Sequence, residues 1–277
     1  MDHGLWTIVN TMNRIKSTFN RLKKNKKKAL IVYITAGYPT LSATERIVLE
    51  LENSGVDIIE LGVPFSDPMA DGLTIQKSSE KSLAAGTTLE KILKSVKNIR
   101  KNSQIPLVLM SYLNPVYHYG IKKFVKDAAR CGADGAIFPD LPPEESDEFG
   151  KVASVEDFYI IFLASPTSTP ERMKTIAKHS KGFIYYVSLT GVTGARNYLP
   201  PDISQNIRKI KRISDKPVCV GFGVSNERQA HIISKIADGV IVGSAVVNVI
   251  GKYIKSGKVE KAVGCFASRL AKAVHDR

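Results

Sequence analysis

Short apolar runs alternate with longer segments of helical periodicity along most of this chain. The short runs are rich in β-branched residues, which favours strands over helices. Eight strands are predicted, at Ala29–Thr35, Asp57–Leu61, Leu107–Ser111, Gly135–Phe138, Tyr159–Leu163, Phe183–Ser188, Val218–Gly221 and Gly239–Val242. Apolar residues three and four positions apart predict helices between them, including Ala43–Asn53, Leu89–Lys101, Lys122–Cys131, Pro170–Lys178, Ser204–Ile213 and Glu227–Ile236.

This alternation of strand and helix is typical of βαβ units and a parallel sheet. Eight units in a chain of 277 residues, with no Pro- or Ser-rich linker, favour a single α/β domain over residues 1–277, closed as a (β/α)8 barrel. An open, doubly wound sheet is the alternative. A further amphipathic helix is predicted at Met12–Lys24, with Met12, Ile15, Phe19 and Leu22 on one face. We expect residues 1–28 to be a helical extension that caps the bottom of the barrel.

Composition narrows the class of protein. Hydrophobic residues make up 43% and charged residues 24%, as in globular proteins. Three widely separated cysteines, Cys131, Cys219 and Cys265, match neither a disulfide framework nor a metal-binding spacing, so we expect reduced thiols and no metal. Their pattern indicates a reducing compartment. No apolar run approaches the ~18 residues of a membrane span, and the first residues resemble neither a signal nor a transit peptide.

Basic residues exceed acidic ones, giving a net charge of +14. The densest basic run is Lys23–Lys28, and the other basic residues are scattered beside acids at helical spacing. No nucleic-acid-binding motif accompanies them, so we expect a solvated surface rather than a nucleic-acid partner.

Two carboxylates are associated with the second predicted strand, one near its end and one in the loop that follows. Alternation places Ile58, Glu60 and Gly62 on one face of the strand, and the bulkier aliphatic residues on the other suit the outside of the barrel. Glu60 is therefore predicted to point into the barrel mouth, where desolvation raises the pKa of a carboxyl group. Asp71 lies eleven positions later in a Pro-containing loop. Together they suit acid–base chemistry, although a structural ion pair for Glu60 and a loop cap for Asp71 remain alternatives.

Glycines mark the ends of the last two strands. Gly221–Ser225 and Gly243–Ala245 follow strands seven and eight, where barrels of this type bind phosphate. Turn geometry is the alternative reason for these glycines. The Gly- and Thr-rich segment Leu189–Asn197 has the composition of a lid, or of an ordinary flexible loop.

With these segments in view, the chain resembles the tryptophan synthase alpha subunit family. The matching strings are ELGVPFSDPMADGLTIQ at Glu60–Gln76, PDLPPEES at Pro139–Ser146, YYVSLTGVTGAR at Tyr185–Arg196, GFGVS at Gly221–Ser225 and VGSA at Val242–Ala245. They appear in family order within residues 29–250. One departure is Leu73, where the family usually has proline, which puts the stiffness of the Asp71 loop in doubt. The Lys- and Ile-rich composition, with ASPTST and SYLNPVYHYG, is similar to the cyanobacterial and algal-plastid branch.

The resemblance implies retro-aldol cleavage of indole-3-glycerol phosphate to indole and glyceraldehyde 3-phosphate, without a cofactor. It implies that Glu60 is the general acid–base and that Asp71 binds the indole N–H. It further implies that Tyr185 and Thr193 line the substrate, with Thr193 contacting Asp71 when the lid closes, and that Gly194, Gly223, Gly243 and Ser244 bind the phosphate. Phe222, flanked by two glycines, is expected to pack against the substrate, with core packing as the alternative. Tyr112 is expected to form a pocket wall or a partner surface.

A partner is implied as well. The family's beta subunit is a pyridoxal-phosphate enzyme that receives indole within an alpha2-beta2 heterotetramer. We expect it to dock on the catalytic face, near Pro64–Pro68, Tyr112–Gly120 and the lid. The compartment would be the plastid stroma if the chain is plastid-encoded, and the cytoplasm otherwise. Three alternatives remain: a stand-alone indole-forming lyase, a catalytically weak activating subunit, and another phosphate-binding barrel such as a sugar-phosphate isomerase.

Overall fold

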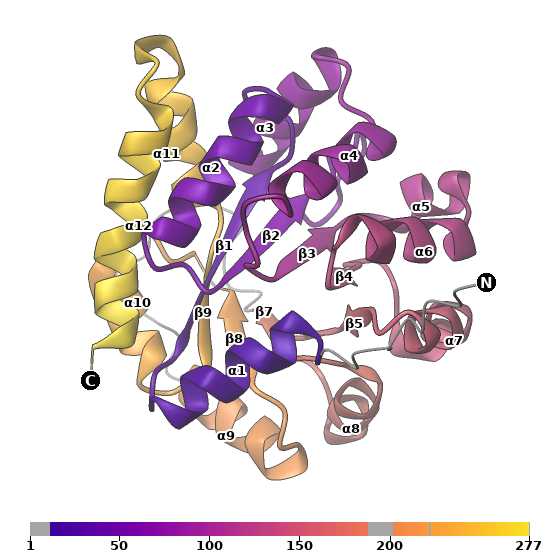
Figure 1. The fold of residues 1–277 in the computed structure, drawn as a ribbon. Helices are drawn as coiled ribbons and strands as arrows, with labels where there is room; N and C mark the ends of the chain where they lie inside the picture. The colour runs from indigo at the N-terminus through magenta and orange to yellow at the C-terminus, as the bar shows by residue number, and fades with distance from the viewer. Residues whose placement is uncertain (1–11, 188–201, 222, 277) are drawn as a thin grey trace, which may run out of the picture.

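The fold is a parallel barrel surrounded by helices (Figure 1). The structure, a computed structural model, describes residues 12–187, 202–221 and 223–276. Its strands are β1 Ala29–Thr35, β2 Ile58–Gly62, β3 Leu107–Met110, β4 Gly135–Ile137, β5 Tyr159–Ile161, β6 Leu163–Ala164, β7 Ile184–Val187, β8 Val218–Gly221 and β9 Gly239–Val242. The spatial order is β5-β4-β3-β2-β1-β9-β8-β7-β6. The predicted barrel is thereby confirmed, and the open doubly wound sheet is not observed.

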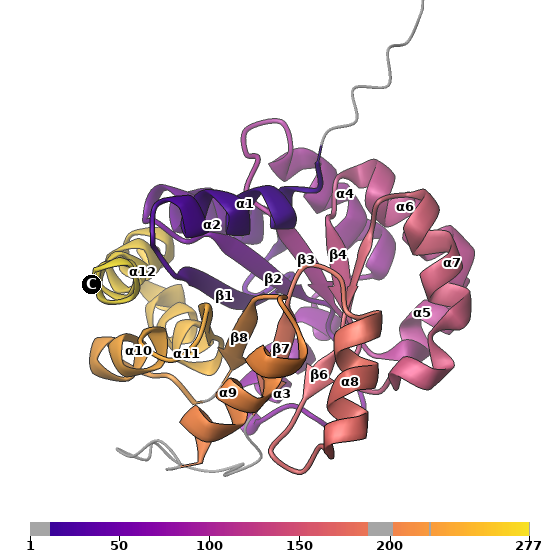
Figure 2. The ribbon, with the colours of Figure 1, turned by 90° about the horizontal axis from the view of Figure 1, so that it is seen from below.

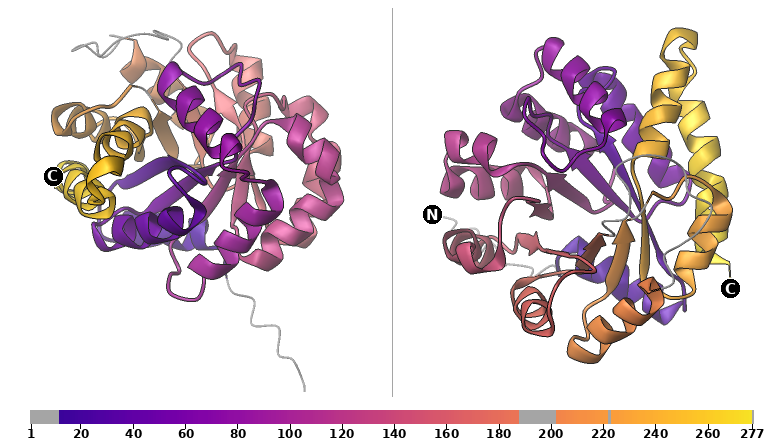
Figure 3. Two further views of the ribbon diagram at one scale, coloured as in Figure 1. Left: turned by 90° about the horizontal axis from the view of Figure 1, so that it is seen from above. Right: turned by 180° about the vertical axis from the view of Figure 1, so that it is seen from behind.

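Helices follow the strands and cover the outer face of the sheet (Figure 2). They are α1 Arg14–Lys24, α2 Leu41–Asn53, α3 Leu73–Ala84, α4 Leu89–Ile99, α5 Leu113–Tyr119, α6 Ile121–Cys131, α7 Asp147–Val155, α8 Pro170–His179, α9 Ile203–Ile213, α10 Glu227–Ser234, α11 Ser244–Tyr253 and α12 Val259–His275, with short 3-10 turns at Pro143–Glu145 and Ile254–Ser256. The last helix, α12, packs against α2, α10 and α11 (Figure 3).

The sequence predicts eight strands, but the structure interrupts the fifth of them. The backbone N–H of Phe162 donates to the hydroxyl of Ser180 at 3.2 Å instead of joining the ladder. The residues before Phe162 form β5 and pair with β4, whereas those after it form β6 and pair with β7. One interrupted strand therefore has partners on both sides, and this brings the two edges of the sheet together.

Side-chain alternation divides the core into two clusters. Outward residues, of which Ile59 and Leu61 are examples, pack under the helices in the larger cluster. Inward residues fill the barrel in a second cluster that includes Ile58, Val108, Ile137, Ile161 and Ile241. The predicted faces of the second strand are therefore confirmed.

Helix α1 packs its apolar face into the interior cluster. Ile15, Phe19 and Leu22 are buried there, and the ring of Phe19 lies 5.8 Å from that of Phe183. The prediction for Met12 was wrong, because the helix begins only at Arg14 and Met12 is 51% exposed. Asn13 caps the beginning of α1. Its side chain accepts a hydrogen bond from the N–H of Ile15 and donates one to the carbonyl of Asp134.

Candidate active site

Glu60 occupies the interior of the barrel in the middle of β2. Its neighbours in register are Tyr33 on β1 and Val108 on β3. The carboxyl group is completely buried, and neither oxygen has a hydrogen-bond partner among the described residues. Burial raises the pKa of Glu60 to about 8, because the charged form loses its hydration. Within that part of the chain the structural ion pair considered above is not observed, and the group is poised for proton transfer near neutral pH.

Two tyrosines flank Glu60 within the barrel. Burial raises the pKa of both Tyr33 and Tyr185 well above the usual value, and charge on Glu60 and Asp71 adds to the effect. Glycines make room for both rings: a Cβ on Gly62 would lie 2.1 Å from the Tyr33 hydroxyl, and one on Gly221 would lie 2.5 Å from that of Tyr185. The barrel mouth therefore holds two neutral phenols beside the buried carboxyl group.

The Asp71 loop is held by groups from two sides. The hydroxyl of Tyr112 accepts from the N–H of Ala70 at 2.9 Å, and the side chain of Gln76 donates to the carbonyl of Asp71 at 2.7 Å. Burial raises the pKa of Asp71 to about 6, while a hydrogen bond from Tyr112 opposes that rise. Asp71 therefore ionises at a lower pH than Glu60, which separates the roles open to the two carboxyl groups.

Tyr112 is positioned by the loop that follows β4. It precedes α5, and the N–H of Leu113 donates to both carboxylate oxygens of Asp140, at 2.9 and 3.1 Å. The ring of Tyr112 also lies 5.3 Å from the ring of Phe65 in the Asp71 loop. The segments PDLPPEES and ELGVPFSDPMADGLTIQ therefore both contact the beginning of α5, through Asp140 and Phe65 respectively.

Leu73, the departure from the family pattern, is the first residue of α3. Gly72 caps the helix, and the side chain of Leu73 is 62% exposed. The first position of a helix accepts proline or another residue, because its N–H has no partner within the helix. Leu73 therefore leaves the path of the loop up to Asp71 compatible with the family pattern.

Three hydroxyl residues of the site, Tyr33, Thr35 and Ser78, were not predicted from the sequence. The Tyr33 hydroxyl lies 3.4 Å from Thr35 Oγ1, and Thr35 Oγ1 lies 2.6 Å from Ser78 Oγ on α3. This chain of hydroxyls joins the barrel interior to the helix that follows the Asp71 loop. Alternation along β1, counted from Ile31, would have placed Tyr33 and Thr35 inside the barrel.

The predicted phosphate-binding residues are only partly described. Gly243 caps α11 and Ser244 begins it, so the first N–H groups of this helix face the end of β9. Gly223 follows β8 with a φ of 38°, a left-handed backbone that favours glycine. Thr193, Gly194 and Phe222, together with the predicted lid, lie outside the described residues. Within that description Glu60, Asp71, Tyr112 and Tyr185 come together, and Gly223 and Gly243 follow strands that neighbour β7 and β1.

Residues that could hold a metal ion are not grouped in the described part of the chain. No cluster of three or more His, Cys, Asp or Glu side chains occurs there. None of its helices is both long and apolar enough to cross a membrane.

Comparison with known proteins gives a consistent family. A sequence model described as Tryptophan synthase alpha chain matches residues 19–275. The chain is 53% identical to the tryptophan synthase alpha chain of Geotalea daltonii over 247 residues, which cover 89% of this chain and 93% of the relative. It is 50% identical to that of Geotalea uraniireducens over 263 residues, covering 95% and 98%.

Solved structures agree with the sequence relatives. Tryptophan synthase subunit alpha from Legionella pneumophila has a TM-score of 0.89 and 40% identity, covering 95% of this chain and 99% of its own. A chain of Mycobacterium tuberculosis tryptophan synthase has a TM-score of 0.87 and 37% identity, covering 96% and 99%.

Proposed function

Because this chain belongs to the tryptophan synthase alpha chain family, we propose how its residues cleave indole-3-glycerol phosphate. The alpha chain is a carbon–carbon lyase that converts this substrate to indole and glyceraldehyde 3-phosphate in tryptophan biosynthesis. It uses no cofactor, and pyridoxal phosphate belongs to the beta subunit. The observation that carries the proposed mechanism is the pair of carboxyl groups, Glu60 and Asp71, with separated pKa values.

Glu60 is the proposed general acid–base. The bond between indole C3 and the glycerol chain breaks once C3 is protonated, and the proton of the adjacent hydroxyl leaves as the aldehyde forms. A carboxyl group with a pKa of about 8 is mostly protonated at pH 7 and can donate the first of these protons. Since neither oxygen is engaged by a described residue, the group is free to meet the substrate and then to accept a proton.

Asp71 is the proposed partner of the indole nitrogen. With a pKa of about 6 it is mostly ionised at pH 7, so it can accept a hydrogen bond from the indole N–H. Protonation at C3 places positive charge on the ring, and the carboxylate stabilises that charge as it develops. The hydrogen bonds from the N–H of Ala70 to Tyr112 and from the side chain of Gln76 to the carbonyl of Asp71 hold the loop in place without neutralising this carboxylate.

The remaining predicted residues are proposed to bind the rest of the substrate. Tyr185 and Tyr112 supply walls on either side of the carboxyl groups, and Phe222 and Thr193 are further substrate contacts. For the phosphate we propose the N–H groups near Gly194, Gly223, Gly243 and Ser244. The N-terminus of α11 supports this assignment because unpaired N–H groups and the helix dipole favour an anion.

The partner of this chain is the beta subunit of tryptophan synthase. We propose an alpha2-beta2 stoichiometry, and docking at the face that carries the Asp71 loop, in which Met69 is 89% exposed. We also propose that residues 1–277 form a single domain.

A reducing bacterial cytoplasm is supported by the three cysteines without a disulfide and by the bacterial relatives. These relatives do not support the cyanobacterial or algal-plastid branch, nor a plastid location.

The function is tested by incubating the purified chain with indole-3-glycerol phosphate and measuring indole, alone and with saturating beta subunit. We expect slow cleavage alone and faster cleavage in the complex. Equal rates would indicate a stand-alone lyase. No indole in either case would contradict the proposed catalysis and leave an activating subunit.

A further inference from the structure

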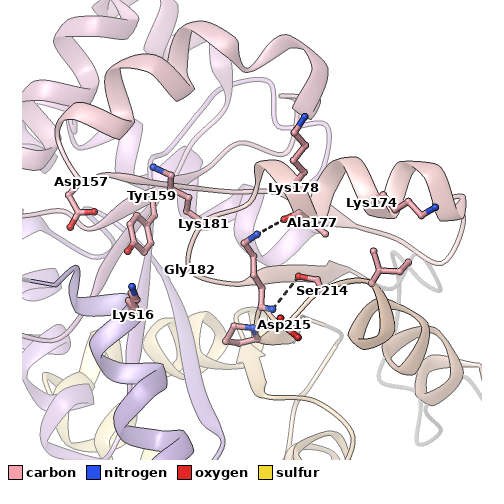
Figure 4. A pocket seen from close by; sticks show the side chains of 13 residues that line it. Lys16, Asp157, Tyr159, Lys174, Ala177, Lys178, Lys181, Gly182, Ser214 and Asp215 are labelled. Atoms are coloured by element: carbon pink, nitrogen blue, oxygen red, sulfur yellow. Dashed lines mark hydrogen bonds between the residues drawn. The ribbon is translucent and has the colours of Figure 1, made fainter.

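A cavity of about 710 Å³ lies at the end of the barrel where strands begin (Figure 4). It is bordered by α1, α8 and the segments that lead into β5, β7 and β8, where these strands begin. Ile15 of α1 is buried in the barrel interior, whereas the next residue, Lys16, borders the cavity. Helix α1 therefore contributes one face to the barrel interior and another to this cavity.

Five lysines border the cavity from separate segments of the chain. They are Lys16 on α1, Lys174 and Lys178 on α8, Lys181 before β7 and Lys216 before β8. In Figure 4, Lys16 and Lys181 lie on one side of the cavity, and Lys174 and Lys178 lie towards the other. The lysines thus border one concave surface from both sides, while the ammonium groups of Lys174 and Lys178 point outward in this view.

None of these lysines forms an ion pair with a described residue. Two of them have neutral partners: Lys216 Nζ donates to the carbonyl of Ala177 at 2.5 Å, and Lys181 Nζ lies 3.2 Å from the hydroxyl of Ser154. Lys28 and Lys211, by contrast, both contact Asp238. The charge of the five lysines at this cavity is therefore not compensated by an ion pair with a described residue.

Only two acidic residues, Asp157 and Asp215, border the cavity, and both are exposed. Three positive charges consequently remain in excess. A concave surface with one excess sign of charge concentrates ions of the opposite sign. Between the lysines, Tyr159, Ala177, Ile213 and Pro217 supply apolar wall, and the volume falls within the ~300–1,000 Å³ range of small-molecule sites.

We infer that this cavity binds a small polyanion carrying two or more phosphate groups. Such a molecule carries about as many negative charges as the cavity has excess positive ones. Lysine ammonium groups on flexible stems bind phosphate as point charges, so five of them around one concave surface suit clustered phosphate groups. The site accounts for part of the basic excess that the catalytic reaction does not use.

The direct test is calorimetric titration of the wild-type chain with inorganic tripolyphosphate at low ionic strength. The cavity variant is Lys174→Gln/Lys178→Gln/Lys181→Gln, and the matched control is Lys97→Gln/Lys122→Gln/Lys126→Gln on α4 and α6. Both lose three charges from exposed helical or turn positions. Lys216 is left intact because it donates to a backbone carbonyl.

We expect the cavity variant to bind tripolyphosphate about tenfold more weakly or worse, because each lost charge removes a close Coulombic contact. The control should bind within about twofold of wild type, and both variants should keep the basal rate of indole formation. Equal weakening in the two variants would reduce the effect to net charge and overturn the proposal. So would wild-type binding by the cavity variant, or no binding by the wild type.

A second measurement needs no substitution. Limited acetylation of the wild-type chain, read by mass spectrometry, should show tripolyphosphate protecting Lys174, Lys178 and Lys181 but not Lys97, Lys122 and Lys126. Uniform protection of all six lysines, or none, would contradict a site in this cavity even if the triple variant failed to fold.

Discussion

The hydroxyl of Tyr112 accepts a hydrogen bond from the backbone N–H of Ala70 at 2.9 Å. This contact fixes the residue just before Asp71 to the beginning of α5, and the same hydroxyl also bonds the Asp71 carboxyl group. Asp140 in turn holds the N–H of Leu113. The ionisation and the position of Asp71 therefore depend on two loops that follow different strands.

Tyr112→Phe should move the acidic limb of the pH profile. The hydrogen bond from Tyr112 lowers the pKa of Asp71, so its loss should raise that pKa above about 6. Since the reaction needs ionised Asp71, the limb of kcat/KM should move to higher pH, with a loss of roughly threefold to tenfold at pH 6 and less at pH 8. Tyr253→Phe on α11 is the control. An unshifted limb would show that Tyr112 does not govern the ionisation of Asp71.

Glu60→Gln should alter the pH dependence of stability. The pKa of Glu60 is about 8 when folded and 4.5 when unfolded, so its neutral form is favoured by folding. Its contribution is fully present below pH 4.5 and is lost as the pH rises towards 8. Relative to wild type, Glu60→Gln should therefore gain stability between pH 5 and pH 8, on the order of a few kcal/mol. Urea unfolding at both values measures this change. Glu148→Gln, at an exposed site, should show no such gain, and the absence of a gain in Glu60→Gln as well would refute the unpartnered carboxyl group.

Much of this arrangement is readable from the sequence, because strand alternation is a local property. Inward Glu60 follows from the apolar residues beside it, and the predicted limits of β1, β8 and β9 are confirmed. The interruption at Phe162 is different, since it depends on the hydroxyl of Ser180, which is distant in sequence. A hydrophobic pattern along the strand cannot predict such a contact.

The candidate site shows the same division. Motifs predict that Glu60 and Asp71 are the reactive carboxyl groups, but the pKa values of the two groups depend on burial by several segments at once. Tyr33 was missed because nothing in its own strand distinguishes it from a core aromatic. Its place beside the site depends on Gly62 of the next strand, which leaves room for the Tyr33 hydroxyl.

Gly243→Val should raise KM for indole-3-glycerol phosphate by roughly tenfold, with a smaller change in melting temperature. A side chain here would obstruct the first N–H groups of α11, and its Cβ would lie 3.4 Å from the Cβ of Tyr33. Gly223 is a poorer probe, because its positive φ would strain valine. Steady-state kinetics and thermal unfolding together separate the two roles. Unchanged KM with a lower melting temperature would assign Gly243 to turn geometry alone.

Thr193→Val should weaken activation by the beta subunit more than it weakens the isolated chain. The expected lid contains Thr193, and its hydroxyl is predicted to reach the Asp71 carboxylate only when partner binding closes the lid. The measurement compares wild type and Thr193→Val, each with and without saturating beta subunit. Equal fold-activation of the two proteins would show that the coupling does not pass through this hydroxyl.

The central claim is that the buried, unpartnered carboxyl group of Glu60 transfers the protons of the cleavage reaction. The most direct measurement is the steady-state rate of indole formation by Glu60→Gln at pH 7, with substrate binding and circular dichroism recorded on the same protein. The amide keeps the shape of the side chain but cannot exchange a proton. We predict a fall in kcat of ~10²–10⁴-fold with the fold and binding retained. A variant that kept more than roughly a tenth of the wild-type rate would contradict the claim, given that expected loss.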